Sequence, residues 1–258
     1  MNRIVRFVTT ASAVAGLVVP QAQAQREGKP TVAILYFNNN AFTKDARDLD
    51  GLTKGVPDFL ITEMSSNRNI RVIERDQVVK LIEEQKLITG GQVDRETAVK
   101  VGKLLGAQHM IFGGFMADPK GNFRIDARAV NVQTGEIEHT ERVQDKADNI
   151  MPLIAQLAEK LNAGMHLPSS PAAGTDASAP AASGSSGTSG SPSTGARQTG
   201  APAATPKLPM RLAVMYGKAL DLKDHGDKSR ATELFSAVLK EFPDYEPARA
   251  EQRKLKGA

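Results

Sequence analysis

Four carboxylates stand close together in one amphipathic stretch, residues 72–87, and their type and spacing could support acid–base chemistry. They are Glu74, Asp76, Glu83 and Glu84. Paired carboxylates act as acid and base when burial separates their pKa values. On a helix, however, Val78, Leu81 and Ile82 would form an apolar stripe, and lysines at helical spacing would neutralise the acids. The pattern favours a solvated helix face, with Asp76 capping the helix and pairing with Lys80.

Other residue types that carry chemistry show no functional spacing. No two of the four histidines are three to five residues apart, so no zinc site can be recognised; they are His109, His139, His166 and His225. Asp48-Leu49-Asp50-Gly51 resembles part of a calcium loop, but Ala46 and Pro57 occupy positions that require acids. The glycine-rich runs contain neither the motif of a phosphate loop nor that of a nucleophile elbow, and the chain has no cysteine. We therefore predict no catalytic, cofactor or metal site and no enzymatic activity, although a periplasmic hydrolase whose residues meet only in the fold remains an alternative.

Residues 1–24 have the pattern of a secretory signal peptide. Two arginines precede an apolar stretch, and Ala22-Gln23-Ala24 forms a small-residue cleavage site. A buried N-terminal helix is the alternative interpretation. The pattern predicts export to the periplasm, where a chain without cysteine depends on core burial for its stability.

The charge of the chain is nearly balanced. Lys and Arg number 33 against 29 Asp and Glu, and the basic residues form no cluster. This excludes an electrostatic argument for nucleic-acid binding. Beyond the signal peptide no run of 18 apolar residues occurs, so we expect no transmembrane segment and at most peripheral contact with the outer membrane.

Residues 169–206 consist almost entirely of Ser, Pro, Ala, Gly and Thr. Such a composition cannot bury enough apolar surface to fold, so we predict a disordered linker. It separates a first domain, residues 30–165, from a C-terminal unit, residues 207–258.

The first domain alternates strand and helix patterns. The apolar run 31–37 predicts a strand buried on both faces. Residues 52–64 have helical periodicity, with a kink or a helix start expected near Pro57. Residues 70–74 predict a short strand, residues 72–87 contribute the helix described above, and residues 97–105 predict another helix with Asp94 as its N-cap.

The second half of this domain reads as a meander followed by a helix. Residues 108–116 predict a strand in which Gly113 and Gly114 mark a bulge or a close backbone approach. Residues 123–129 alternate strictly between apolar and charged, which indicates a half-buried strand. Tight connections at 118–122 and 133–136 predict an antiparallel meander, and residues 150–161 a closing helix. The order β-α-β-α-α-β-β-β-α predicts an α/β fold with a mixed sheet.

The C-terminal unit has only helical patterns. Leu212, Met215, Ala219 and Leu222 share one helix face, and Ala231, Leu234, Phe235 and Val238 share another. The spacing of Ala219, Ala231, Phe235 and Pro243 resembles the packing positions of one tetratricopeptide repeat, with residues 245–256 as a capping helix. Because a single repeat cannot form a continuous core, we expect it to dock on the first domain, on another subunit or on a partner.

The sequence of motifs over residues 30–163 resembles the CsgG family of curli production assembly/transport components. The motifs are GLTKGVPDFLITEMSS, VIERDQVVKLIEEQKL, GQVDRETAVKVGKLLGAQHMIFGGF and IDARAVNVQTGEI. The resemblance implies an anticodon-binding-domain-like α/β fold, a periplasmic or outer-membrane location, and assembly of copies side by side in rings.

Two departures from the family limit what the resemblance implies. Its pore-forming members are lipoproteins with long membrane-spanning hairpins, whereas this chain has no cysteine to acylate. The corresponding connections, 118–122 and 144–149, are shorter than the about 9–11 residues of a membrane strand. We therefore predict an oligomeric accessory of envelope assembly or secretion whose C-terminal unit binds envelope or secreted proteins. The alternative is a subunit of an outer-membrane secretion channel complex.

Overall fold

The computed structural model describes residues 28–42, 46–88, 92–146, 148, 150–169 and 208–257. The predicted signal peptide, with Ala22 and Ala24 at its cleavage site, lies outside these residues. Of the predicted linker, only Ser169 is described.

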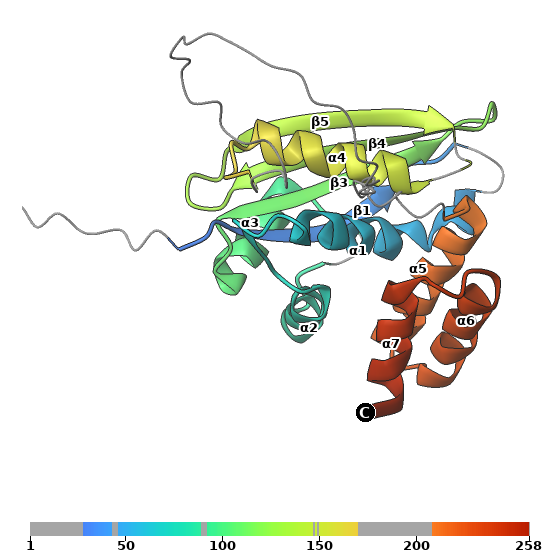
Figure 1. The fold of residues 1–258 in the computed structure, drawn as a ribbon. Coiled ribbons are helices and arrows are strands. Elements are labelled where there is room, and N and C mark those ends of the chain that lie inside the picture. The colour runs from blue at the N-terminus through green and yellow to red at the C-terminus, as the bar shows by residue number, and fades with distance from the viewer. Residues whose placement is uncertain are drawn as a thin grey trace, which may run out of the picture.

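A five-stranded mixed sheet forms the centre of the first domain (Figure 1). The strands are β1 (Thr31–Asn39), β2 (Arg71–Val72), β3 (His109–Ala117), β4 (Asn122–Asn131) and β5 (Ile137–Lys146). Their order is β2-β1-β3-β4-β5; β1 pairs in parallel with β2 and β3, while β3, β4 and β5 pair antiparallel. The predicted mixed sheet and its meander are therefore confirmed.

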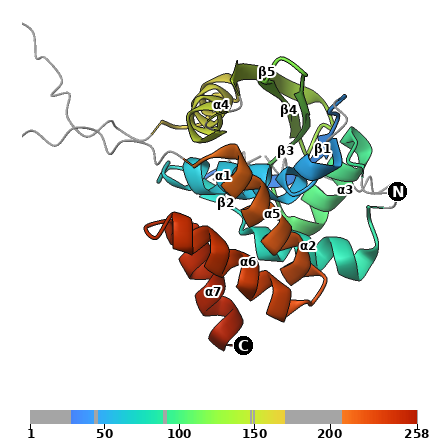
Figure 2. The ribbon, with the colours of Figure 1, turned by 90° about the vertical axis from the view of Figure 1, so that its right-hand side faces the viewer.

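Four helices cover the two faces of this sheet. They are α1 (Leu52–Ser65), α2 (Arg75–Gln85), α3 (Arg95–Leu105) and α4 (Ile150–Gly164), and a short 3-10 helix, η1 (Ala46–Leu49), precedes α1. The helices α1 and α4 lie on one side of the curved sheet, and α3 lies against the other (Figure 2). The α/β fold class predicted from the sequence is confirmed.

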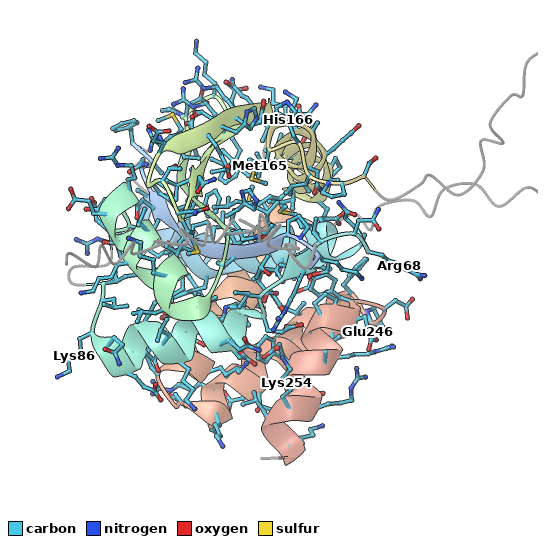
Figure 3. All side chains as sticks on the ribbon, turned by 90° about the vertical axis from the view of Figure 1, so that its left-hand side faces the viewer. Arg68, Lys86, Met165, His166, Glu246 and Lys254 are labelled. Atoms are coloured by element: carbon cyan, nitrogen blue, oxygen red, sulfur yellow. The ribbon has the colours of Figure 1, made fainter. Side chains whose placement is uncertain are left out.

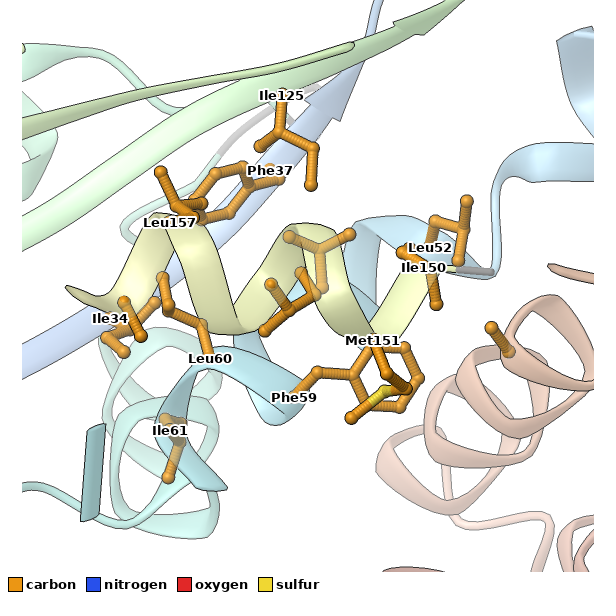
Figure 4. Packing of buried hydrophobic residues seen from close by; sticks show 14 of the residues in the cluster. Ile34, Phe37, Leu52, Phe59, Leu60, Ile61, Ile125, Ile150, Met151 and Leu157 are labelled. Carbon is orange, nitrogen blue, oxygen red and sulfur yellow. The ribbon is translucent and has the colours of Figure 1, made fainter. Parts of the chain in front are cut away.

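The alternation of β4 separates the two faces. Phe123, Ile125, Ala127 and Ala129 are buried toward α1 and α4, where they join the main core. Figure 4 shows Ile125 and Phe37 of the sheet close to Leu157 of α4. A second, smaller core under α2 and α3 contains Met110 and Phe112 of β3.

Three local predictions in this domain can be compared with the backbone. Asp94 caps α3, since its Oδ1 accepts from the N–H of Thr97 at 2.8 Å, as predicted. The helix α1 begins at Leu52 and runs through Pro57, so no helix starts at the proline. Gly113 marks a close approach, because a Cβ there would lie 2.1 Å from the carbonyl oxygen of Asp126 on β4.

Three further helices follow the gap in the described chain. They are α5 (Met210–Asp224), α6 (Lys228–Glu241) and α7 (Glu246–Gly257). Of the three docking modes expected from the sequence, the structure has the first, because α5 packs on α1 and its side chains join the main core of the α/β domain. Both views place α5 beside α1 (Figures 1 and 2).

Candidate functional site

The contact between α1 and α5 depends on glycines. A Cβ on Gly217 of α5 would lie 1.8 Å from the carbonyl oxygen of Gly51, and a Cβ on Gly51 would lie 2.3 Å from the carbonyl oxygen of Val214. Small residues at a helix crossing allow backbones to approach closely, and any side chain here would push the helices apart. The two helices therefore meet backbone to backbone at this point.

Tyr216 lies at the centre of the same contact. Its ring is fully buried and stacks on Phe59 of α1, with ring centroids 5.5 Å apart. Phe235 of α6 and Tyr245, which precedes α7, pack around it at 5.6 and 5.4 Å. The Tyr216 hydroxyl donates a 2.7 Å hydrogen bond to Oδ2 of Asp58 on α1. The tyrosine thus ties all three C-terminal helices to α1 through one polar and several apolar contacts.

An ion-pair network continues this contact toward α2. Arg75, only 5% exposed, pairs with Asp224 at the end of α5, and Lys54 Nζ lies 3.7 Å from the same carboxylate. Lys54 also lies 3.5 Å from the centroid of the Tyr36 ring. Arg75 Nε is buried and has no hydrogen-bond partner among the described residues. Because buried charges need partners, the network holds the end of α5 in a fixed position.

Asp76 connects the network to α7. Its two oxygens accept from Lys223 of α5 at 2.8 Å and from Lys254 of α7 at 3.2 Å, and both lysines also bind Glu251. Figure 3 shows Lys254 where α7 faces α2. The ammonium groups of both lysines thus lie between Asp76 of α2 and Glu251 of α7. These charged hydrogen bonds fix the position of α7 relative to α2.

The pKa values in this network follow from burial and charge. Burial raises the pKa of Asp58, although Arg75 and the hydrogen bond from Tyr216 act in the opposite direction. Burial also acts to raise the pKa of Asp76, but Lys223 and Lys254 outweigh it and hold this pKa below its ordinary value. Burial therefore disfavours the charged form of Asp58, whereas the two lysines favour the charged form of Asp76.

A cleft opens beside these residues, between α1, α2 and α7, with a volume of about 290 Å³. Ile61, Pro247 and Ala250 give it apolar walls, and residues of both charges surround them. The hydroxyl of Thr62 donates to the carbonyl of Asp58 within α1. These walls and charges suit recognition of a segment with apolar and charged groups.

The structure also places the acids of residues 72–87. All four are exposed, and Lys80 Nζ lies 3.8 Å from Glu84 Oε1, as the solvated-face interpretation predicts. The predicted role of Asp76 is wrong: Glu74 is the N-cap residue of α2 and makes no side-chain capping bond. Asp76 lies in the first turn, where the two lysines of the C-terminal helices compete successfully for its carboxylate.

The predicted repeat-packing residues and the histidines lie in separate parts of the structure. Ala219, Ala231 and Phe235 are fully buried among the C-terminal helices, whereas Pro243 is exposed. Three histidines lie against separate acids, namely His109 on Glu138, His139 on Glu141 and His225 on Asp221. Among the described residues, no group of three or more His, Cys, Asp or Glu is arranged to hold a metal ion. Nor is any helix in the described ranges long and apolar enough to span a membrane.

Sequence reasoning missed the residues that matter most at this contact: Asp58, Arg75, Tyr216 and Asp224. One signal was present, since Asp58 is the one polar side chain within the run 55–61, beside Pro57. Arg75 gave none, because it stands between Glu74 and Asp76 and resembles any other base of a solvated helix.

Comparison with known proteins relates the chain to one family. A family model described as curli production assembly/transport component CsgG matches residues 16–120, from within the predicted signal peptide to the turn between β3 and β4. No curated protein matches the chain. The match ends before β4, although we expected the resemblance to reach residue 163, and it does not include the C-terminal helices. The tetratricopeptide resemblance therefore stays a prediction.

Several solved structures are distantly similar. The LpoB C-terminal domain from Escherichia coli is 15% identical, with 46% of this chain and 83% of that chain covered and a TM-score of 0.36. A lipoprotein from Neisseria meningitidis is 11% identical, with 52% and 94% covered and a TM-score of 0.37. The PelC dodecamer from Paraburkholderia phytofirmans is 11% identical, with 54% and 89% covered and a TM-score of 0.33. The CsgG resemblance predicted from the sequence is supported, by the family model, for residues 16–120.

Proposed function

We propose that this protein is a non-enzymatic, exported accessory of cell-envelope assembly or secretion, in a system of the curli type. It binds a segment of a partner protein in the cleft beside α7 and forms homo-oligomers through the CsgG-like domain. The family match supports the envelope and assembly parts of the proposal.

The observation that carries the binding role is the packing of α5 on α1. This contact holds α7 against the α/β domain and leaves a cleft of about 290 Å³ with apolar walls and charges of both signs. Exposed apolar surface within a rim of charges is typical of sites that bind protein segments.

Site-specific photocrosslinking tests this role. A photoreactive phenylalanine analogue at Ala250, in the wall of the cleft, is expected to crosslink to an envelope protein. The matched control carries the analogue at Ser229, an exposed residue of α6 away from the cleft, and is expected to give no adduct. Equal crosslinking at both positions, or none at Ala250, would contradict the proposal.

Oligomerisation needs a separate measurement. Light scattering during size-exclusion chromatography of the full mature chain is expected to give a mass above that of one chain. Deleting residues 207–258 is not a suitable variant, because Leu208, Leu212 and Tyr216 belong to the main core and their removal would uncover α1. A monomer at every concentration would refute this part of the proposal.

The alternative function is that of a subunit in an outer-membrane secretion channel complex, with other chains supplying the membrane contact. Fractionation of cells distinguishes the two. The accessory role predicts release with the periplasmic fraction, whereas a channel subunit would pellet with membranes and require detergent.

A further inference from the structure

A second pocket lies on the outer face of the sheet, across the molecule from the core that α1 and α4 cover. Its volume is about 290 Å³. The residues that define it come from the ends of β1 and β3 and from the middle of β4 and β5, and they include Asn40, Gly114, Arg124, Asp126, Arg128 and Arg142. We call this the arginine pocket.

The pocket exists because the helices cover only part of this face. The helices α2 and α3 lie over Met110 and Phe112 of β3, whereas the next residue of β3 on the same face is Gly114. A Cβ at Gly114 would lie 2.5 Å from Nδ2 of Asn40. The glycine thus leaves room for the Asn40 amide, which is one of the groups that line the pocket.

One aspartate fixes the orientation of two arginines. The Nε atoms of Arg124 and Arg142 donate to different oxygens of Asp126, at 2.8 and 2.7 Å. Because each arginine uses Nε for this bond, its terminal amino groups stay available for a ligand. Because the Asp126 carboxylate already holds these two side chains in place, less side-chain entropy is lost when they bind a ligand.

A third arginine leaves the pocket with excess positive charge. Arg128, on the same face of β4, makes no ion pair within the described part of the chain. Asp126 supplies one negative charge against three guanidinium groups, so the pocket attracts an anion. Neutral donors of Asn40 and Thr140 lie among the same lining residues.

We propose that the arginine pocket binds a carboxylate group on an acidic segment of a partner protein, independently of the cleft beside α7. The planar guanidinium fork matches a planar carboxylate in bidentate geometry. Three guanidinium groups against one carboxylate attract anions of either charge, so the phosphate probe of the experiment below separates a phosphate from the proposed carboxylate. The pocket is also open to solvent along the strands, as a chain-borne group requires, since the Arg142 side chain is 65% exposed.

Binding of short peptides to the full chain tests the proposal. The probes are a blocked Gly-Glu-Glu-Gly peptide, its Gly-Gln-Gln-Gly counterpart and inorganic phosphate, each at the same ionic strength. NMR signals of the arginine Nε–H groups and of the Asn40 side-chain amide report occupancy. The glutamate peptide is expected to shift these signals in a saturable manner, and the glutamine peptide is expected to leave them unchanged.

Two variants localise the binding. Arg128→Gln removes one guanidinium from the exposed face of β4 and is expected to weaken glutamate-peptide binding about tenfold or more, as for loss of a charged hydrogen bond. Arg95→Gln makes the same charge change at an exposed position of α3 and is expected to keep wild-type affinity. Equal binding of both peptides, binding of phosphate alone, no binding of the glutamate peptide, or equal effects of the two variants would overturn the proposal.

Discussion

Replacing Gly217 with alanine tests the packing of the C-terminal helices on the α/β domain. The new Cβ would lie 1.8 Å from the carbonyl oxygen of Gly51, a backbone atom that cannot rotate away. To relieve this contact, α5 would have to move from α1 by about an ångström, because methyl groups tolerate no such overlap. That movement would also lengthen the 2.7 Å hydrogen bond from Tyr216 to Asp58.

The expected loss of stability combines three contributions. Overpacking of a close contact costs about 1–3 kcal/mol. Weakening of the hydrogen bond to the buried Asp58 carboxyl costs up to about 1–3 kcal/mol. The higher helix propensity of alanine offsets roughly 1 kcal/mol of this. We expect the free energy of unfolding to fall by about 2–3 kcal/mol, which lowers Tm by about 4–12 °C in a chain of this size.

Urea unfolding followed by circular dichroism measures this change. The control is Gly257→Ala in α7, where the new Cβ would meet no atom within 4 Å, and its stability is expected to differ from wild type by less than about 0.5 kcal/mol. A Gly217→Ala protein as stable as the Gly257→Ala control would refute the close packing of α5 on α1.

Three further substitutions address single contacts. Tyr216→Phe removes the hydroxyl donor to the buried Asp58 carboxyl, so unfolding is expected to require about 1–3 kcal/mol less free energy, and an unchanged urea midpoint would contradict the hydrogen bond. Asp94→Ala removes the cap that accepts from Thr97 and is expected to cost about 1 kcal/mol, measured by the same unfolding assay; Asp94→Asn should recover most of it. Asp76→Asn removes a half-exposed anion with a lowered pKa and is expected to cost roughly 1 kcal/mol or less. Since a carboxyl with a lowered folded-state pKa stabilises fully above its unfolded pKa of about 3.9, this cost should decrease as the pH falls below that value and through the folded pKa, and a cost that does not decrease below about pH 3.9 would contradict the ion pairs.

Much of the fold follows from local patterns. The apolar run of β1 predicts a strand buried on both faces, and the strict alternation of β4 predicts a strand buried on one face. The structure has both strands as predicted. Short turns force β3, β4 and β5 into a meander, because two-strand connections of this length permit only neighbouring antiparallel strands. These features depend on residues close together in sequence, so periodicity detects them.

The candidate site depends on residues far apart in sequence. Asp76 reads locally as a helix cap for α2, but in the structure its partners are Lys223 and Lys254. The face of α5 that packs on α1 includes Tyr216 and Gly217, which the stripe from Leu212 to Leu222 did not contain. A glycine that allows two helices to touch carries no apolar signal of its own, so composition cannot reveal it.

The described chain is anchored on both sides of residues 170–207. Before them, the carbonyls of Pro168 and Ser169 accept from Asn67 and Asn69 at 2.9 and 2.5 Å, and after them Leu208 is fully buried in the main core. Covalent continuity through this segment is therefore not what holds α5 in place. Two separately expressed fragments, one ending at Ser169 and the other beginning at Leu208, should therefore reassemble into the native fold.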